Sequence, residues 1–163
     1  MQFISEIRRK KLFYLILFVL LIIPRAGQAA YFSDNMEGAA QWTPETPWAT
    51  TTVTGTSHLG AKAWTDSPAG YYANDLDKSL TMTTSVPLST ATTPQLVFWH
   101  KYQLETDFDK GYVEISTDGG TQWSAAILAT YTGISDWKRE QIDLTAFNGQ
   151  ASVKISFRLV TDK

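Results

Sequence analysis

The sequence predicts an all-β fold, an antiparallel β-sandwich or β-barrel. Short segments alternate apolar and polar residues, turn-forming residues separate these segments, and no segment has a convincing helical period. The chain is also rich in Thr, Trp, Tyr and Phe, residues that favour strands over helices.

The segment from Leu96 to Trp123 organises the predicted fold. Its first strand is apolar on both faces, which is typical of the middle of a packed sheet, and a second strand follows at Tyr112–Ile115. Val153–Leu159 shows the clearest alternation. Further strands are expected at Thr50–Thr54, Lys62–Thr65, Ser79–Val86, Ala125–Thr132 and Trp137–Leu144, with a hairpin turn at Asn148–Gly149.

An Asp-box pattern, S-x-D-x-G-x-x-W, ends the central segment with Ser116, Asp118, Gly120 and Trp123 in register. The Asp118 carboxylate can accept hydrogen bonds from the backbone of its own turn, and Gly119 and Gly120 allow positive φ. We expect Trp123 to fold back as an apolar plug against the core. The pattern predicts a stabilised hairpin turn and indicates nothing about catalysis.

The N-terminal residues 1–29 are predicted to be a signal peptide whose apolar part is helical. A basic stretch, Arg8–Lys11, precedes the apolar run Leu12–Ile23, and we expect cleavage after Ala29. Twelve helical residues span about 18 Å, which is short of the roughly 30 Å hydrocarbon core, so this segment is not expected to cross the membrane. Once the signal peptide is cleaved, no stable membrane span is expected. An uncleaved anchor is the alternative. The remaining domain, residues 30–163, is predicted to be secreted, extracellular or at the cell surface.

Charge and cysteine content narrow the function of this domain. Residues 30–163 carry nine Lys and Arg against 15 Asp and Glu, a net charge of −6, which disfavours nucleic acid as a partner. The absence of cysteine leaves the core alone to hold the fold. His58 and His100 are the only histidines, and the lack of an H-E-x-x-H motif excludes that class of zinc peptidase. We expect His100 to be a hydrogen-bonded sheet residue.

Four segments in order along the chain resemble one family. They are FSDNMEG, SVPLS with TPQLVFWHKYQLE, DKGYVEISTDGGTQW, and QIDLTAFNGQASVKISFRLVTD. Together they resemble the MAM-like jelly-roll modules of bacterial secreted proteins, which include immune-inhibitor-A-like MAM, cleaved-adhesin and choice-of-anchor J domains. The resemblance implies an antiparallel jelly-roll β-sandwich, either concanavalin-like (MAM-type) or galactose-binding-like. It also implies a non-catalytic extracellular role in adhesion, carbohydrate binding or support of a neighbouring enzyme.

This sequence departs from that family at its C-terminus. Such modules usually continue past the position of Asp162 into a strand resembling G-W-x-I-D-D-V, whereas the sequence here ends at Lys163. We therefore expect a fragment that lacks its final strand, or a sheet completed by a partner or companion domain. An unpaired edge is expected beside Val153–Leu159, where strand addition would be a hazard.

The resemblance also implies a structural calcium site. Calcium binds six to eight oxygens gathered from loops, and outside the cell such sites can be weak. The implied ligands are three carboxylates from the start, middle and end of the domain, then three neighbours: Glu37, Glu105 and Asp162, followed by Asp34, Asp75 and Asp109. Ordinary solvated loop acids are the alternative interpretation.

The acidic run Glu105–Asp109 allows a catalytic alternative. Alternate residues on a strand share one face at about 6.6–7 Å, which suits the paired carboxylates of glycoside hydrolysis. The run distantly resembles the E-x-D-x-x-E motif of laminarinase-like jelly rolls, although its last acid is an Asp at a different spacing.

Aromatic side chains in turn-rich sequence are candidates for a sugar-binding platform, because ring faces stack on the apolar side of a pyranose. The candidates are Trp48, Trp64, Tyr71 and Tyr72, and packing into the core is the alternative role.

The sequence therefore predicts a secreted, non-catalytic binding or adhesion module whose ligand is a surface glycan or an extracellular protein, with calcium as a structural cofactor. One alternative is an accessory structural domain of a larger secreted hydrolase such as a metalloprotease. The other alternative is a small jelly-roll glycosidase.

Overall fold

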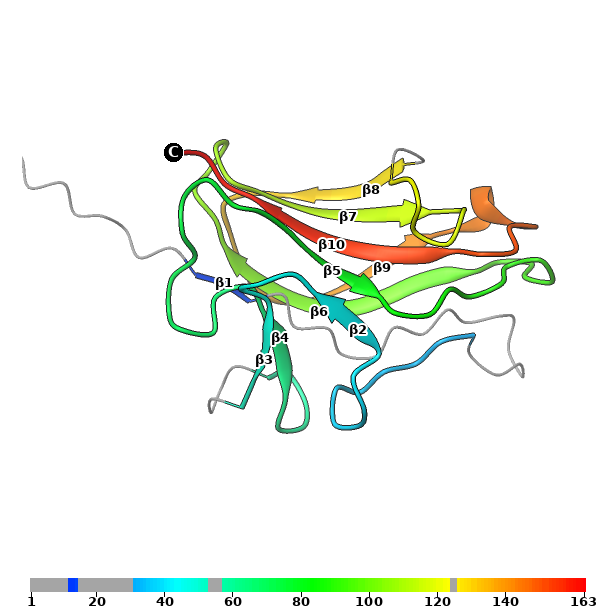
Figure 1. Ribbon diagram of the computed structural model, residues 1–163, viewed down its shortest axis with the longest axis horizontal. Helices are drawn as coiled ribbons and strands as arrows, with labels where there is room; N and C mark the ends of the chain where they lie inside the picture. Colours follow the sequence, from blue (N-terminus) through cyan, green and yellow to red (C-terminus); the bar gives the residue numbers. More distant parts are fainter. Residues whose placement is uncertain (1–11, 15–30, 53–56, 124–125) are drawn as a thin grey trace, which may run out of the picture.

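The computed structural model describes residues 12–14, 31–52, 57–123 and 126–163, which form an antiparallel β-sandwich (Figure 1). A single turn of 3-10 helix, η1, covers Thr145–Phe147. The strands of the described residues are β1 Leu12–Tyr14, β2 Trp42–Pro44, β3 Ala49–Thr51, β4 Ala63–Thr65, β5 Asp77–Met82, β6 Gln95–Gln103, β7 Lys110–Ser116, β8 Ala126–Tyr131, β9 Ile134–Asp143 and β10 Lys154–Val160.

The strands form two larger sheets and a small hairpin. One sheet has the order β2-β5-β10-β7-β8, the other β1-β6-β9, and β3 pairs with β4. The chain passes between the two larger sheets after β5, β6, β8 and β9. Such crossings are typical of jelly rolls. The predicted all-β sandwich is therefore confirmed, and the strands predicted after residue 90 lie within a few residues of their observed positions.

The prediction of a hairpin at Asn148–Gly149 is wrong. The strand before this turn, β9, pairs with β6, whereas the strand after it, β10, belongs to the opposite sheet. Gly149 adopts a φ of 85° and donates its N–H to the Leu88 carbonyl. The dipeptide does form a tight turn, but a turn signal does not specify which sheet the next strand joins.

The predicted unpaired edge beside Val153–Leu159 is also wrong. Strand β10 pairs with β7 over Lys154–Val160 and with β5 over Ser156–Val160, so it lies inside the five-stranded sheet. Alternation in a sequence shows which faces a strand presents but not which strands lie beside it.

Most of the predicted signal peptide, residues 1–29, lies outside the described residues, and its cleavage stays a prediction. Its described part, Leu12–Tyr14, is extended rather than helical, and pairs antiparallel with Gln103, Tyr102 and Lys101 of β6. Without β1, the strand β6 would be at the edge of its sheet and would offer unpaired backbone N–H and C=O groups. Aromatic residues also favour extended structure over helix. Within the described ranges, the structure contains no helix of the length and hydrophobicity needed to cross a bilayer.

The core lies between the two larger sheets. Phe98 of β6 packs edge-on against Phe157 of β10, with ring centroids 5.2 Å apart, and Trp42 contacts Phe157 at 5.6 Å. The N-terminal segment adds Phe32 and Met36, which are buried. Aromatic rings from both sheets therefore join the layers without any disulfide.

His100 lies in this core on the inner face of β6, and its side chain is fully buried. Neither ring nitrogen has a hydrogen-bond partner, so the expectation of a hydrogen-bonded histidine is wrong. Its Nε2 lies 3.7 Å from a carboxylate oxygen of Glu140, and its ring packs 4.5 Å from that of Tyr131. Burial lowers the pKa of His100 to about 4, while Glu140 acts in the opposite direction and Lys138 adds to the lowering.

This burial predicts a pH-dependent stability. Histidine in the unfolded chain titrates near pH 6.5, so between about pH 6.5 and 4 the unfolded chain binds a proton that the folded chain does not. The free energy of unfolding should therefore fall as the pH drops through this window, by up to about 3 kcal/mol. Urea denaturation at a series of pH values measures it.

The control for this prediction is His100→Phe, which keeps an aromatic ring in the cluster and removes the titration. Its stability should depend less on pH between 6.5 and 4 than that of the natural chain. Parallel pH profiles for the two proteins would contradict the assignment.

Candidate functional site

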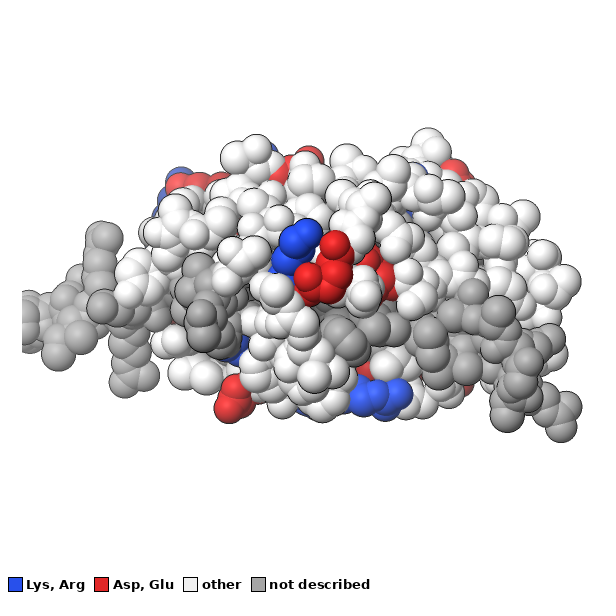
Figure 2. Space-filling model, turned by 90° about the horizontal axis from the view of Figure 1, so that it is seen from below, with Lys and Arg blue, Asp and Glu red and all other residues white. Residues whose placement is uncertain are grey.

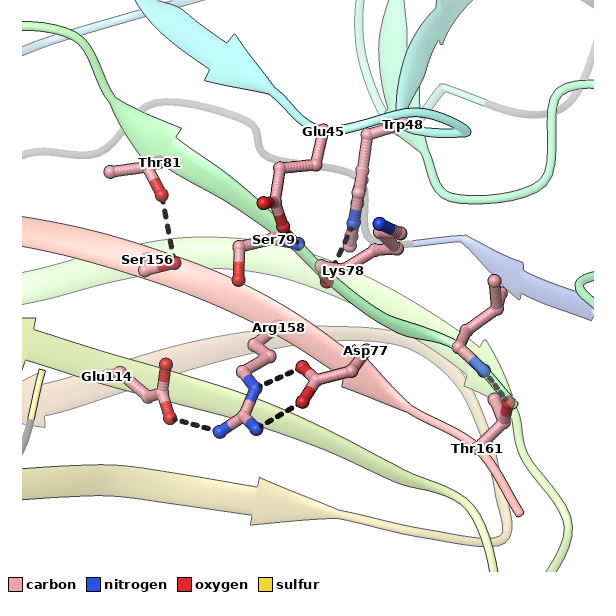
Figure 3. Close-up of polar contacts among 11 residues, drawn as sticks. Glu45, Trp48, Asp77, Lys78, Ser79, Thr81, Glu114, Ser156, Arg158 and Thr161 are labelled. Carbon is pink, nitrogen blue, oxygen red and sulfur yellow. Dashed lines mark hydrogen bonds and ion pairs between the residues drawn. The ribbon is translucent and has the colours of Figure 1, made fainter. Parts of the chain in front are cut away.

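A groove of about 640 Å³ crosses the outer face of the five-stranded sheet, the face turned away from β6 and β9. Figure 3 draws some of its lining side chains, among them Glu45, Thr81, Ser156 and Arg158. We call it the sheet groove. Outward side chains of β2, β5, β7 and β10 line it together with the Asp-box turn. Its lining residues are Thr43, Glu45, Ser79, Thr81, Met82, Glu114, Gly120, Trp123, Lys154, Ser156 and Arg158.

One row of polar residues runs across the strands in this groove. The register places Thr43 opposite Thr81, Thr81 opposite Ser156, and Ser156 opposite Glu114. The hydroxyls of Thr81 and Ser156 lie 3.1 Å apart and share a hydrogen bond. Ser156 and Glu114 are buried, whereas Thr43 is exposed. The row therefore forms part of the floor, with Thr43 at the rim.

Arg158 fixes the charged part of the groove. Its guanidinium donates to both carboxylate oxygens of Asp77 at 2.6 and 2.7 Å, and to Glu114 at 3.1 Å (Figure 3). The bond from Arg158 lowers the pKa of Asp77, and the same contact raises the pKa of Arg158. The guanidinium therefore stays charged, and its bonds to carboxylates on both neighbouring strands hold it in one orientation.

The opposite wall of the groove comes from the segment after β2. Glu45 accepts a 2.7 Å hydrogen bond from the backbone N–H of Ser79, which anchors this carboxylate beside β5. The indole N–H of Trp48 donates to the Lys78 carbonyl at 3.1 Å (Figure 3). These two bonds attach the segment to the sheet.

The Asp-box turn forms the hydrogen bonds that its sequence suggests. The Ser116 hydroxyl donates to Asp118 at 2.7 Å and accepts from the Gly120 N–H at 2.8 Å. Asp118 also accepts from the backbone of Thr121 and Gln122, both at 3.0 Å. These bonds lower the pKa of Asp118, with the Ser116 hydroxyl as the largest cause.

Trp123 does not plug the core as expected. It is half-buried on the outer face of the sheet, where it lines the sheet groove. Its ring and the aliphatic stem of Lys154 both lie over Gly120, because a Cβ at Gly120 would be 3.5 Å from the indole and 3.2 Å from the Lys154 stem. The Asp-box bonds fix the local turn but leave open which face of the sheet receives the indole.

Four of the six predicted calcium ligands come together at one end of the sandwich. Asp109 is buried and accepts hydrogen bonds from the Tyr72 hydroxyl at 2.5 Å, the Glu105 N–H at 3.3 Å and the Asp162 N–H at 3.2 Å. The Asp75 N–H donates to the Asp162 carbonyl at 2.8 Å. Glu105, Asp75 and Asp162 therefore take part here through backbone groups, and Asp109 contributes its carboxylate.

The other two predicted ligands have separate structural roles. Asp34 is buried and accepts the indole N–H of Trp42 at 3.0 Å. Glu37 accepts the backbone N–H groups of Ala61 and Lys62 at 2.7 and 2.9 Å, bonds that lower its pKa. In the part of the chain that the structure describes, no three His, Cys, Asp or Glu side chains gather in a way that would hold a metal ion.

Asp66 is a carboxylate that the sequence did not single out. It is completely buried, accepts a hydrogen bond from the Ser67 hydroxyl at 3.2 Å, and has one oxygen, Oδ2, without a hydrogen-bond partner. Burial raises its pKa well above the ordinary value. It also contributes to the raised pKa of Tyr72 and so lies near the Asp109 cluster. Its sequence, D-S-P-A-G, is typical of an exposed turn and gave no sign of burial.

The acidic run does not form the paired carboxylates of a glycosidase. Residues Glu105–Asp109 form a turn closed by the Asp109 N–H donating to the Glu105 carbonyl at 3.0 Å, and Asp107 has a φ of 69°. They do not alternate along one strand face, because β6 ends at Gln103. The strand geometry on which that alternative depended is therefore wrong.

Three of the four predicted platform aromatics are packed inside the protein. Trp48, Trp64 and Tyr72 are buried, whereas Tyr71 is 53% exposed. An exposed platform built from these four residues is therefore wrong, and core packing is the observed role of three. Large aromatic side chains gain most from burial, even when turn residues surround them in sequence.

Comparison with known proteins gives one informative similarity. The chain is 36% identical to Bacillopeptidase F of Bacillus subtilis (strain 168) over 110 residues. It thus resembles part of a peptidase. The aligned segment covers 66% of this chain but 7% of that peptidase, so the chain spans a small fraction of its relative's length. No family model matches the chain.

The Asp109 cluster predicts a stability difference between two neighbouring tyrosines. Tyr72→Phe removes the hydroxyl that donates to buried Asp109 and should lower the free energy of unfolding by about 2 kcal/mol. Tyr71→Phe, at the exposed neighbouring position, should change it by less than about 0.5 kcal/mol. Urea denaturation followed by tryptophan fluorescence measures both, and equal effects would contradict the role of the bond.

Proposed function

We propose that this chain provides a non-catalytic accessory domain of a larger secreted hydrolase, and that the domain binds a ligand for that enzyme. The similarity to 7% of Bacillopeptidase F carries this proposal. This chain folds as a β-sandwich and matches a short part of a long peptidase. That combination fits an attached module better than a complete enzyme.

The state of the catalytically capable side chains supports a binding role. His100 is buried among aromatic rings, and the ring of His58 stacks on Trp99 with centroids 3.7 Å apart. The carboxylates of Asp109 and Asp34 accept structural hydrogen bonds. Histidines and carboxylates can serve in acid–base catalysis, and these four have structural contacts instead.

The proposed module is MAM-like, located outside the cell, and binds a surface glycan or an extracellular protein. The jelly-roll connections and the four sequence segments that resemble such modules support this assignment. The acidic net charge of residues 30–163 argues against nucleic acid. Among the described residues visible in Figure 2 few are charged, and a basic and an acidic group lie side by side near the middle of this face.

The accessory role predicts the size of the protein that the source cells secrete. An antibody against residues 30–163 should detect a protein well above 18.2 kDa in the medium of the source cells, because the domain would be attached to its enzyme. Casein zymography of the same gel should show hydrolysis at that band. The purified chain, as the matched control, should hydrolyse no casein. A band at or below 18.2 kDa would contradict the accessory role.

Calcium as a structural cofactor is a second part of the proposal. The described carboxylates do not form a complete site, but the Asp66 Oδ2 atom without a hydrogen-bond partner, near the Asp109 cluster, could gain a cation as its partner. Carboxylate oxygens at loop ends are the ligands that calcium uses. Asp66, Asp109 and backbone carbonyls at the end of the sandwich that contains the Asp109 cluster would hold the calcium ion.

Thermal denaturation decides whether calcium binds. Calcium at 5–10 times its Kd should raise the melting temperature. At 5 times Kd, binding should increase the free energy of unfolding by about 1 kcal/mol. Asp66→Asn should abolish the rise, while Asp136→Asn at an exposed strand position should keep it. An unchanged melting temperature across millimolar calcium would refute the site.

A further inference from the structure

We propose that the sheet groove binds an uncharged oligosaccharide, with Trp123 as the stacking surface and the polar row across β5, β10 and β7 as the hydrogen-bonding floor. This inference rests on the proposed binding function and specifies its ligand class and location. It also moves the site from the predicted aromatic residues, most of which are buried, to residues on the outer face of the five-stranded sheet.

Trp123 is a fixed aromatic surface at one end of the groove. Its half-buried indole rests over Gly120 beside the Lys154 stem, and the Asp-box bonds of Ser116 and Asp118 hold the turn that carries it. A preorganised ring loses little conformational entropy when a ligand arrives. Aromatic faces bind the apolar side of pyranose rings, so a positioned indole suits a sugar.

The floor offers donors and acceptors in fixed positions. Thr81 and Ser156 provide hydroxyls that both donate and accept, and Arg158 holds its guanidinium between Asp77 and Glu114. Sugar hydroxyls also donate and accept, so they match a mixed polar surface better than an apolar one. Since these side chains are already ordered by one another, binding does not have to order them.

The charge of the groove favours an uncharged ligand. Its lining contains two acids, Glu45 and Glu114, and two bases, Lys154 and Arg158, which gives a formal charge of zero. The Arg158 guanidinium already forms ion pairs with the carboxylates of Asp77 and Glu114, so its charge is balanced without an anionic ligand. A polyanionic or polycationic polymer would gain no net electrostatic attraction here.

The position of the groove disfavours an extended peptide. Its central strands, β5, β10 and β7, each pair on both sides, so the floor has no free backbone edge for strand addition. Apart from Trp123, the large apolar side chain in its lining is Met82, which is fully buried. Protein hot spots need apolar anchor pockets, and this floor does not provide them.

Affinity electrophoresis tests the proposal with the purified 163-residue chain. Native gels contain barley β-glucan, galactomannan or arabinoxylan as uncharged probes, polygalacturonate as a charged probe, and gelatin as a protein probe. We expect at least one uncharged polysaccharide to retard the chain. Trp123→Ala should weaken that retardation at least tenfold, while Tyr71→Ala, which removes an exposed aromatic away from the groove lining, should leave it unchanged.

A second variant keeps the test decisive if Trp123→Ala alters folding. Thr43 lies exposed at the groove rim, so Thr43→Arg should obstruct the groove without changing the core, and retardation should again fall at least tenfold. Circular dichroism and melting temperature establish that each variant is folded.

Several outcomes would overturn the groove assignment. They are retardation by none of the uncharged polysaccharides, retardation by polygalacturonate or gelatin alone, and unchanged retardation in folded Trp123→Ala or Thr43→Arg. None of these outcomes affects the size of the secreted product or its casein hydrolysis, so failure of the groove is distinguishable from failure of the accessory role.

Discussion

Pairing of β10 on both of its edges is the constraint on which the rest of the structure depends. Hydrogen bonds to β5 and β7 place segments that are far apart in sequence in one continuous register. The inner face of β10 then directs Phe157 against Phe98 and Trp42. Its outer face directs Ser156 and Arg158 into the sheet groove. One strand therefore supplies both the core contact between the layers and the polar floor.

The acidic residues of this domain mostly stabilise its folded chain. Asp118 holds the Asp-box turn, Glu37 holds the loop before β4, and Asp109 joins the ends of three strands through backbone and hydroxyl donors. Carboxylates that accept two or more N–H groups stabilise loops that would otherwise leave polar backbone unpaired. A negatively charged sequence can therefore reflect loop construction as much as metal binding, and Asp66, which has an oxygen without a hydrogen-bond partner, differs from the others.

Residue patterns predicted some elements well and others poorly for identifiable reasons. The alternation in Val153–Leu159 and the Ser116–Gly120 turn depend on neighbours in sequence, and both have the predicted local form. The run Glu105–Asp109 has the residue spacing of a strand face, but a closed turn and the Tyr72 hydroxyl decide its shape. Asp66 and the groove position of Trp123 had no local signal at all, because both follow from packing against distant strands.

The sequence by itself determined that this chain forms strands, that its layers are held without disulfides, and that an Asp-box closes one turn, since these depend on period, composition and short-range hydrogen bonds. Only the tertiary structure decided which strands are neighbours, which aromatics are buried, and which side chains line the sheet groove. Those features depend on contacts between residues such as Ser156 and Thr81, 75 positions apart. Their geometry is set by the closing of two sheets on a shared core, which no short segment contains.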